Sequence, residues 1–181
     1  SADAVPGTLQ DLLMARIDRM GPAKALAQLG SVLGREFTRA LLAALAQRRD
    51  LPVAIGSVDA QLQRLLDGGL IGYKAGDAGG LYYFRHALTR EAAYQSLWVR
   101  DRRQCHAVAA DVLRQHFDGT VLAKPETLAR HYELADQHAD ALIHWERAAR
   151  VAMAHSAHAE ATEHIEHALA LAARLGDDNA A

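Results

Sequence analysis

The segment "LIGYKAGDAGGLYYFRHALTREAAYQSL", residues 70–97, decides the fold predicted for the first half of the chain. Two short β-prone runs, "LIGYK" and "LYYFR", flank a turn rich in Gly and Asp, which is the pattern of a β-hairpin. The second run passes directly into a helical pattern, and His86 stands at the junction. The segment therefore predicts a hairpin followed by a helix, with an ionisable ring between them.

Helical patterns precede this hairpin. A first helix is predicted within residues 1–20, and Pro22 suits the first turn of a second helix that Gly34 ends. A third helix follows, and Ser57 can cap a fourth, "VDAQLQRLLDGG". Three helices followed by a hairpin is the order of a winged helix, here over residues 21–86.

The fourth helix has its leucines at helical spacing, so we expect it to pack inward against the two helices before it. The leucines of this helix and the residue that follows it are Leu62, Leu65, Leu66 and Leu70. Their predicted partners in the core are Leu29, Leu33, Phe37, Leu41 and Leu42.

From residue 87 to the end the pattern is helical again, with short breaks, so we predict a mainly α protein with antiparallel helical repeats over residues 87–181. The last two helices form a pair about as long as a tetratricopeptide unit. Small residues recur where helices would cross closely: Ala141, Ala148, Ala149, Ala152, Ala161 and Ala168. We expect this array to be truncated and to leave an open groove for a protein or peptide partner. Tyr132 and Trp145 would contact that partner unless they are core residues.

Composition limits the function classes. Half of the 181 residues are hydrophobic, so the chain is not of the disordered type. The formal net charge is −2, whereas a general polyanion binder needs a basic excess. The single cysteine, Cys105, excludes an internal disulfide, and we expect it to be a small buried side chain. No stretch approaches the roughly 20 apolar residues that span a bilayer, so we expect a cytoplasmic protein without membrane contacts.

Standard catalytic motifs are missing from the sequence. It contains no GxxxxGK[ST], no GxGxxG after a strand, no GxSxG and no HExxH, so we expect no enzymatic activity from this chain. The ten histidines include two pairs at i,i+3 spacing, His155 with His158 and His164 with His167. A zinc site on that helix face is one interpretation, and a solvated polar face is the other. We favour the polar face and expect no metal site.

A winged helix raises the alternative of a DNA-binding transcriptional regulator, and the charges argue against it. The helix that would enter the major groove carries Arg64 against Asp59 and Asp67. A groove reader needs basic and amide side chains on one exposed stripe, with phosphate contacts beside it, and Gln61 and Gln63 cannot supply that alone. We therefore expect no nucleic-acid partner.

The chain resembles one class of large bacterial signalling proteins. The resemblance rests on "VPGTLQDLLMARIDRMGPAKALAQLGSVLGREF", "LQRLLDGGLI", "YYFRHALTREAAYQSL" and "RRQCHAVAADVL", and it covers about residues 5–175. The class is the signal-transduction ATPases with numerous domains, the STAND class, in multidomain proteins that often carry a class III adenylate or guanylate cyclase or a transcription-regulator domain. The segment FxHALxxxAAYxSL, here Phe84 to Leu97, is the most specific part.

This resemblance implies a non-catalytic regulatory segment of a larger ATPase. Residues 1–20 would be a linker helix after a missing ATPase core, residues 21–86 a winged helix acting as a lid on that core, and residues 87–181 the start of a tetratricopeptide-like sensor array. ATP or ADP with magnesium would belong to the parent protein, because Walker A and B motifs are not in this chain. The missing nucleotide-binding domain of the same chain would be the first partner.

The resemblance also gives His86 a specific role. In related NACHT and apoptosome proteins, an F-x-H segment of the winged helix places its histidine on the β-phosphate of ADP, and Phe84-Arg85-His86 matches that pattern. An imidazole N–H is a good phosphate donor, and an adjacent helix N-terminus adds positive potential. The alternative is a structural histidine that caps the helix or bonds a backbone carbonyl. The nucleotide role requires His86 to lie at the surface of this chain.

Overall fold

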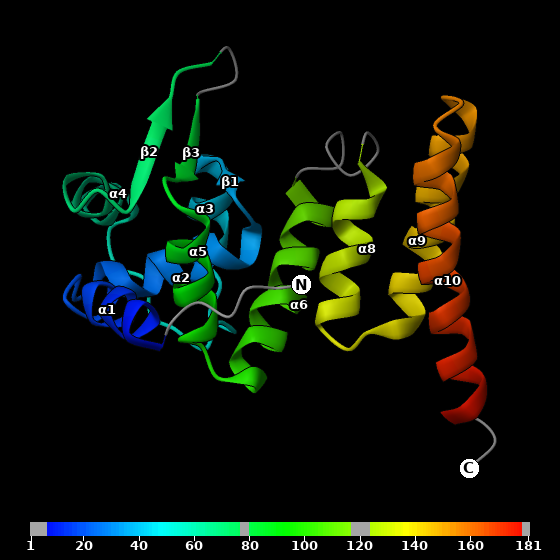
Figure 1. Cartoon of the computed structure of the whole chain (residues 1–181), viewed down its shortest axis with the longest axis horizontal. Coiled ribbons are helices and arrows are strands. Elements are labelled where there is room, and N and C mark those ends of the chain that lie inside the picture. The colour runs from blue at the N-terminus through cyan, green and yellow to red at the C-terminus, as the bar shows by residue number, and fades with distance from the viewer. Residues whose placement is uncertain (1–6, 77–79, 117–123, 179–181) are drawn as a thin grey trace. The chain divides into compact units, whose positions relative to one another are not determined.

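The computed structural model describes residues 7–76, 80–116 and 124–178 (Figure 1). These residues are mainly helical and include a small three-stranded antiparallel sheet, which confirms the predicted mainly α class. The chain divides into two compact units, Ser1–Cys105 and His106–Ala181. No helix among the described residues combines the length and apolarity needed to cross a bilayer.

The first unit holds most of the short elements, and α6 continues from it into the second. In chain order the elements are α1 (Gly7–Asp18), α2 (Ala23–Leu33), β1 (Glu36–Phe37), α3 (Arg39–Ala46), α4 (Val58–Asp67), β2 (Ile71–Lys74), β3 (Leu81–Phe84), α5 (Ala87–Gln95) and α6 (Val99–His116).

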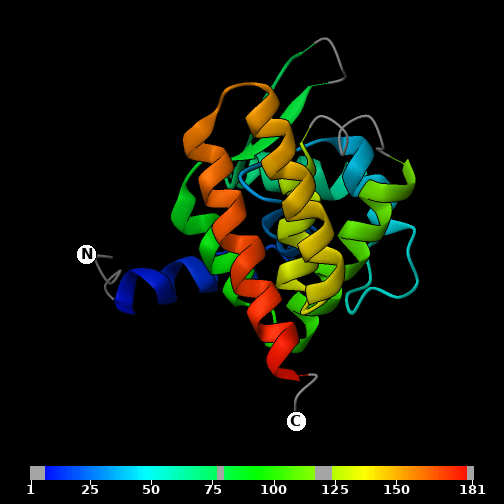
Figure 2. The same cartoon turned by 90° about the vertical axis from the view of Figure 1, so that its right-hand side faces the viewer.

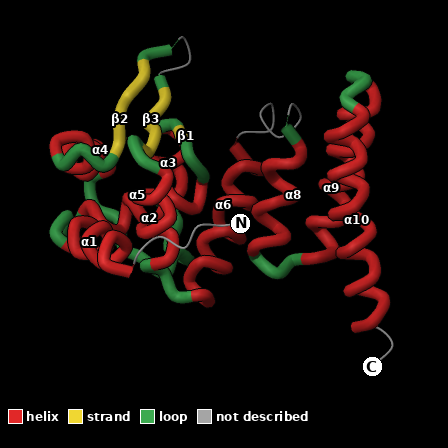
Figure 3. The backbone as a smooth tube through the Cα atoms, viewed as in Figure 1, coloured by secondary structure: helices red, strands yellow, loops and turns green. Residues whose placement is uncertain are grey.

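The sheet confirms the predicted hairpin and adds a strand to it. Strands β2 and β3 pair antiparallel with Ile71 opposite Phe84, and β1 pairs with the other edge of β3, giving the order β1-β3-β2 (Figure 3). Sequence patterns missed β1 because two residues are too few to show alternation. Its Phe37 holds it in place, since the ring stacks on Tyr82 and meets Phe84 edge-on.

Local sequence signals set the helix ends, as predicted for Ser57 and Gly34, and Thr38 adds a cap that was not predicted. The Thr38 Oγ1 accepts a hydrogen bond from Leu41 N at 3.2 Å, and Ser57 Oγ accepts from Ala60 N at 3.5 Å, so each hydroxyl caps the helix that follows it. Gly34 ends α2 with φ at +128°, a value that a residue with a Cβ rarely adopts.

The predicted core of the first unit is largely confirmed. Leu62, Leu65 and Leu70 are buried, and they share one apolar cluster with Leu29, Phe37 and Leu42. Of the other three predicted members, Leu33 and Leu66 are half-buried and pack against this cluster, and Leu41 is half-buried. Gly30 permits close packing here, because a Cβ built at this position would lie 2.9 Å from the Phe37 ring.

Helix α5 packs with the first unit. It contacts α1 and α2, and the Gln28 Nε2 of α2 donates to the Ser96 Oγ at the end of α5 at 2.9 Å. The contacts therefore divide the chain at residue 105, within α6, whereas the sequence-based boundary at residue 86 was drawn from the change of secondary-structure pattern.

The second unit is helical throughout its described part. After α6 come α8 (Pro125–Leu134), α9 (His138–Ala154) and α10 (His158–Asp178), and α9 and α10 run antiparallel side by side (Figures 1 and 2). Every alanine predicted at a close helix crossing is buried, from Ala141 at 0% exposure to Ala168 at 9%. Small side chains let these helix axes approach closely, and Trp145 supplies the bulk between them.

Truncating a core leucine of α4 tests this packing. Leu65 is 1% exposed, so Leu65→Ala leaves a cavity and should lower the free energy of unfolding by about 2–5 kcal/mol in urea titrations. Leu12→Ala is the matched control, because Leu12 is 64% exposed on α1, and it should change that free energy by less than about 0.5 kcal/mol. Equal effects at the two positions would contradict the assigned core.

Candidate functional site

His86 lies at the surface, at the N-cap of α5. Its backbone is extended, with φ −130° and ψ 133°, and its carbonyl accepts hydrogen bonds from Thr89 N and Arg90 N, the first bonds of the helix. The imidazole is exposed and makes no capping hydrogen bond. His86 therefore lies at the surface, as the nucleotide role requires, and the helix-capping alternative for its side chain is wrong.

The chain that leads into His86 is fixed by the sheet and by the end of α4. Phe84 is buried, and its N–H donates to Arg35 O at 3.1 Å. The Arg85 N–H donates to Leu70 O at 3.2 Å, and its Nε donates to Ile71 O at 3.1 Å. These bonds hold the backbone immediately before His86, so the ring projects from a rigid support.

The surroundings of His86 favour a negatively charged ligand. The N-terminus of α5 carries positive potential from its unpaired N–H groups, and no acidic residue lies in its first turn. Arg85 is exposed beside it in the sequence, and Arg90 lies one turn on, with its Nη2 3.4 Å from the Glu91 carboxylate. An imidazole, a helix N-terminus and guanidinium groups are the donors that recognise phosphate.

Helix α4, the candidate DNA-reading helix, has most of its polar groups already paired. Arg39 of α3 donates two hydrogen bonds to Asp59, each at 2.6 Å, and this contact lowers the pKa of the Asp59 carboxyl. Gln63 donates to Asp67 at 2.8 Å. Gln61 is buried, where its amide can donate to Pro22 O and accept from Gly56 N. Within α4, Arg64 is the single basic residue.

The two histidine pairs at i,i+3 spacing lie in different environments. His155 and His158 are exposed near the turn between α9 and α10. His164 and His167 are half-buried against Trp145, and the His167 ring stacks on the indole with centroids 4.3 Å apart. The interpretation of all four as a solvated polar face is thus wrong for the second pair. Across the described ranges, no three His, Cys, Asp or Glu side chains gather as metal ligands would.

Trp145 and Tyr132 are core residues, each 6% exposed, so neither forms the partner surface considered for them. The indole Nε1 of Trp145 donates to the Glu133 carboxylate of α8 at 2.9 Å, and His167 of α10 lies 3.4 Å from the same oxygen. Tyr132 stacks on His144. These contacts tie α8, α9 and α10 together.

A buried histidine pair joins α6 to α8, and sequence reasoning missed it. His106 and His131 are 2% and 5% exposed, with their Nδ1 atoms 2.9 Å apart, so one ring donates and the other accepts. Burial, with a smaller contribution from Arg130, lowers the pKa of His131 to about 4. Both histidines lie on the apolar faces of their helices, and this is the one signal that the sequence offers for their burial. No local sequence pattern could predict that two residues 25 positions apart form a pair.

Cys105 confirms the expectation of a small buried side chain. It is fully buried, and burial raises the pKa of its thiol to about 12, so the group stays protonated and unreactive near neutral pH.

Comparisons with known proteins find a relative of this chain at low sequence identity. No family model matches it, and no solved structure matches it. An uncharacterized protein of Rhizobium meliloti (strain 1021) is 24% identical over 172 residues, which cover 95% of this chain and 16% of the relative. The chain thus spans about a sixth of the length of the relative that it matches.

The buried histidine pair predicts acid sensitivity. An unfolded His131 titrates near pH 6.5 and the folded one near 4, so the unfolded state binds the proton more readily between these values. Stability should be full above pH 6.5 and fall as the pH drops, by about 2 kcal/mol from pH 7.5 to 5. His131→Asn keeps an acceptor for His106 and should remove most of this loss in urea titrations at the two pH values.

His155→Asn is the matched control, because it removes an exposed histidine and should leave the pH dependence as it is in the wild type. A wild-type protein as stable at pH 5 as at pH 7.5 would contradict the assignment of a neutral, buried pair.

Proposed function

We propose that this chain is a non-catalytic regulatory segment of a multidomain bacterial signal-transduction ATPase of the STAND class. In this proposal, the first unit contains a winged helix that acts as a lid on a nucleotide-binding domain, and the second is a tetratricopeptide-like helical-repeat region. The observation that carries the proposal is the exposed imidazole of His86, held at a helix N-terminus and not used as a cap.

The order of elements supports the winged-helix part. Helices α2, α3 and α4 precede the β2–β3 hairpin, and the short strand β1 between α2 and α3 pairs with that hairpin. The core that joins α4 to α2 and β1 is apolar, which suits a compact three-helix arrangement. The antiparallel α8, α9 and α10, with alanines at their crossings, support the helical-repeat part.

The proposed mechanism depends on one phosphate contact. With ADP in the nucleotide-binding domain of the same protein, His86 would donate an N–H to the β-phosphate, and the α5 N-terminus would add its potential. This contact exists only in the closed arrangement, so it stabilises the closed state whenever ADP is bound. ATP and magnesium belong to that other domain, and this chain contributes the anion contact alone.

The output would come from an attached domain. We propose a class III adenylate or guanylate cyclase or a transcription-regulator domain, controlled by intramolecular contacts and by a protein partner on the helical repeats, in the cytoplasm. A longer parent protein agrees with the Rhizobium relative, in which the matched segment is 16% of the length.

A DNA-binding winged-helix protein is the second candidate, and the order of helices and strands is the observation that favours it. The bidentate pairing of Arg39 with Asp59 and the burial of Gln61 leave α4 poor in groups that read bases. A mobility-shift assay with random duplex DNA at low salt separates the two candidates, and retention of DNA at micromolar protein would favour this one.

His86→Ala tests the proposed function in the full-length protein. Removing one charge-assisted contact to ADP should weaken ADP relative to ATP by about 1.5–3 kcal/mol, measured by titration calorimetry with each nucleotide. Because only the closed state makes the contact, output from the attached domain should rise without a new agonist.

His155→Ala is the control, since it removes another exposed histidine and should leave the nucleotide preference unchanged. A lowered melting temperature for His86→Ala together with an unchanged ADP preference would instead make His86 a structural residue.

The isolated chain should not bind ATP tightly, because it contains no phosphate-binding loop. Calorimetric titration of the 181-residue chain with ATP and magnesium should give no saturable heat at micromolar concentrations. One-to-one binding with low-micromolar affinity would contradict a purely regulatory segment.

A further inference from the structure

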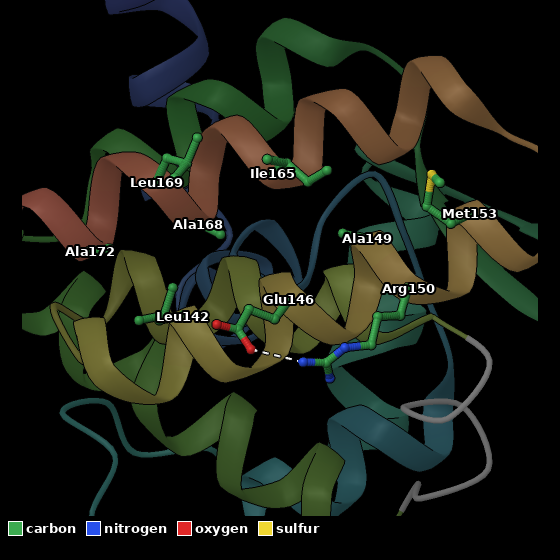
Figure 4. Close-up of a pocket in the computed structure, with 9 residues that line it drawn as sticks. All are labelled: Leu142, Glu146, Ala149, Arg150, Met153, Ile165, Ala168, Leu169 and Ala172. Atoms are coloured by element: carbon green, nitrogen blue, oxygen red, sulfur yellow. Dashed lines mark hydrogen bonds and ion pairs between the residues drawn. The ribbon is translucent and has the colours of Figure 1, made fainter.

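The α9–α10 pair carries an apolar groove of about 520 Å³ on its outer side (Figure 4). Leu142 and Met153 of α9 line one wall, and Ile165 and Leu169 of α10 line the other. His144 of α9 stacks on Tyr132 of α8. It lies on the opposite face of α9 from the groove residues 142 and 146. The groove therefore lies on the face of α9 away from α8, and its lining includes the crossing alanines Ala149 and Ala168.

The side chains of this groove are apolar and unusually exposed. Leu169 is 65% exposed, Met153 54% and Ile165 44%. They recur at helical spacing on two antiparallel helices, so they form two parallel ridges with a furrow between them. A third helix fits such a furrow by placing its own ridge of apolar side chains between the two rows.

The charges in the groove indicate which kind of helix would fit. Glu146 and Arg150 are its charged residues, and they pair with each other at 3.1 Å, one turn apart on α9 (Figure 4). This pairing leaves no net charge to select an acidic or a basic peptide. An uncharged apolar ridge is the matching surface, as on the inner face of an amphipathic helix.

We propose that the groove holds an amphipathic helix of the same, longer polypeptide, stacked on α9 and α10 as the next helix of the array. This inference rests on the helical-repeat part of the proposed function. Terminal pairs of such arrays need a polar outer face, and Leu169 and Ile165 give this pair an apolar one, as in an interior pair. In the Rhizobium relative, about five-sixths of the polypeptide lies outside the matched segment, so chain to fill the groove is available there.

A single new thiol in the groove tests the proposal. Leu169→Cys is introduced into the 181-residue chain and into the polypeptide encoded by the complete gene, and its rate of reaction with a maleimide is followed by peptide mass spectrometry. The native Cys105 does not interfere, because it is fully buried and its pKa is about 12. Ala170→Cys is the control, since Ala170 is exposed at the adjacent position on another face of α10.

We expect the two thiols to react at similar rates in the 181-residue chain. In the complete polypeptide the thiol at position 169 should react at least about tenfold more slowly, with the thiol at position 170 unaffected, because a docked helix covers one face of α10 alone. A benzophenone maleimide attached at position 169 should then cross-link to a helical segment of the same polypeptide.

Three results would overturn the proposal. Equal reactivity at position 169 in the short and the complete polypeptide would show that nothing covers the groove. Protection that grows with the concentration of the 181-residue chain would assign the groove to a second copy. A cross-link to a different protein would make it a partner site. None of these results depends on His86, so the nucleotide part of the proposed function is tested separately.

Discussion

The burial of Phe84 in the central strand is the contact on which the first unit depends. β3 pairs with β2 on one side and β1 on the other, so its last residue is fixed from both edges. The Phe84 ring is 1% exposed and meets Phe37 edge-on, which also holds β1 to the sheet. Because α5 begins three residues later, the same contact fixes the position and direction of His86.

The second unit depends on a different constraint, the protonation state of its histidines, because several ring contacts between its helices involve an imidazole. A neutral imidazole packs well against Trp145 or against another imidazole, whereas protonating one ring of the His106–His131 contact would bury a charge, and protonating both would place two donors face to face. The packing of α6 on α8 is therefore tied to the protonation state. Where Glu133 is within reach, as at His167, a nearby carboxylate offers the ring a partner in either state.

Local signals in the sequence predicted the helices and the hairpin. The features that the sequence could not predict depend on contacts between residues far apart in the chain. Thr38, Ser57 and Gly34 act through bonds within one turn of their own helix, so their roles can be read from neighbouring residues. The strand β1, the pair His106–His131 and the burial of Trp145 each require a partner more than ten residues away. The place of His86 at the junction of a strand and a helix was predictable because this turn is itself a local pattern.

The two proposed binding sites differ in what they can report. A phosphate contact made by His86 would depend on which nucleotide is bound, and a contact of a few kcal/mol is enough to change a two-state population by a factor of ten to several hundred. The apolar groove between Met153 and Leu169 has no net charge through which to sense a phosphate, because Glu146 and Arg150 pair with each other, so its occupancy would not follow the nucleotide directly. On the proposed function, the first unit would therefore carry the contact that depends on the bound nucleotide. The second unit would carry a contact that stays the same with either nucleotide. The chain passes from the first unit to the second within α6, where Cys105 and His106 lie on either side of the division.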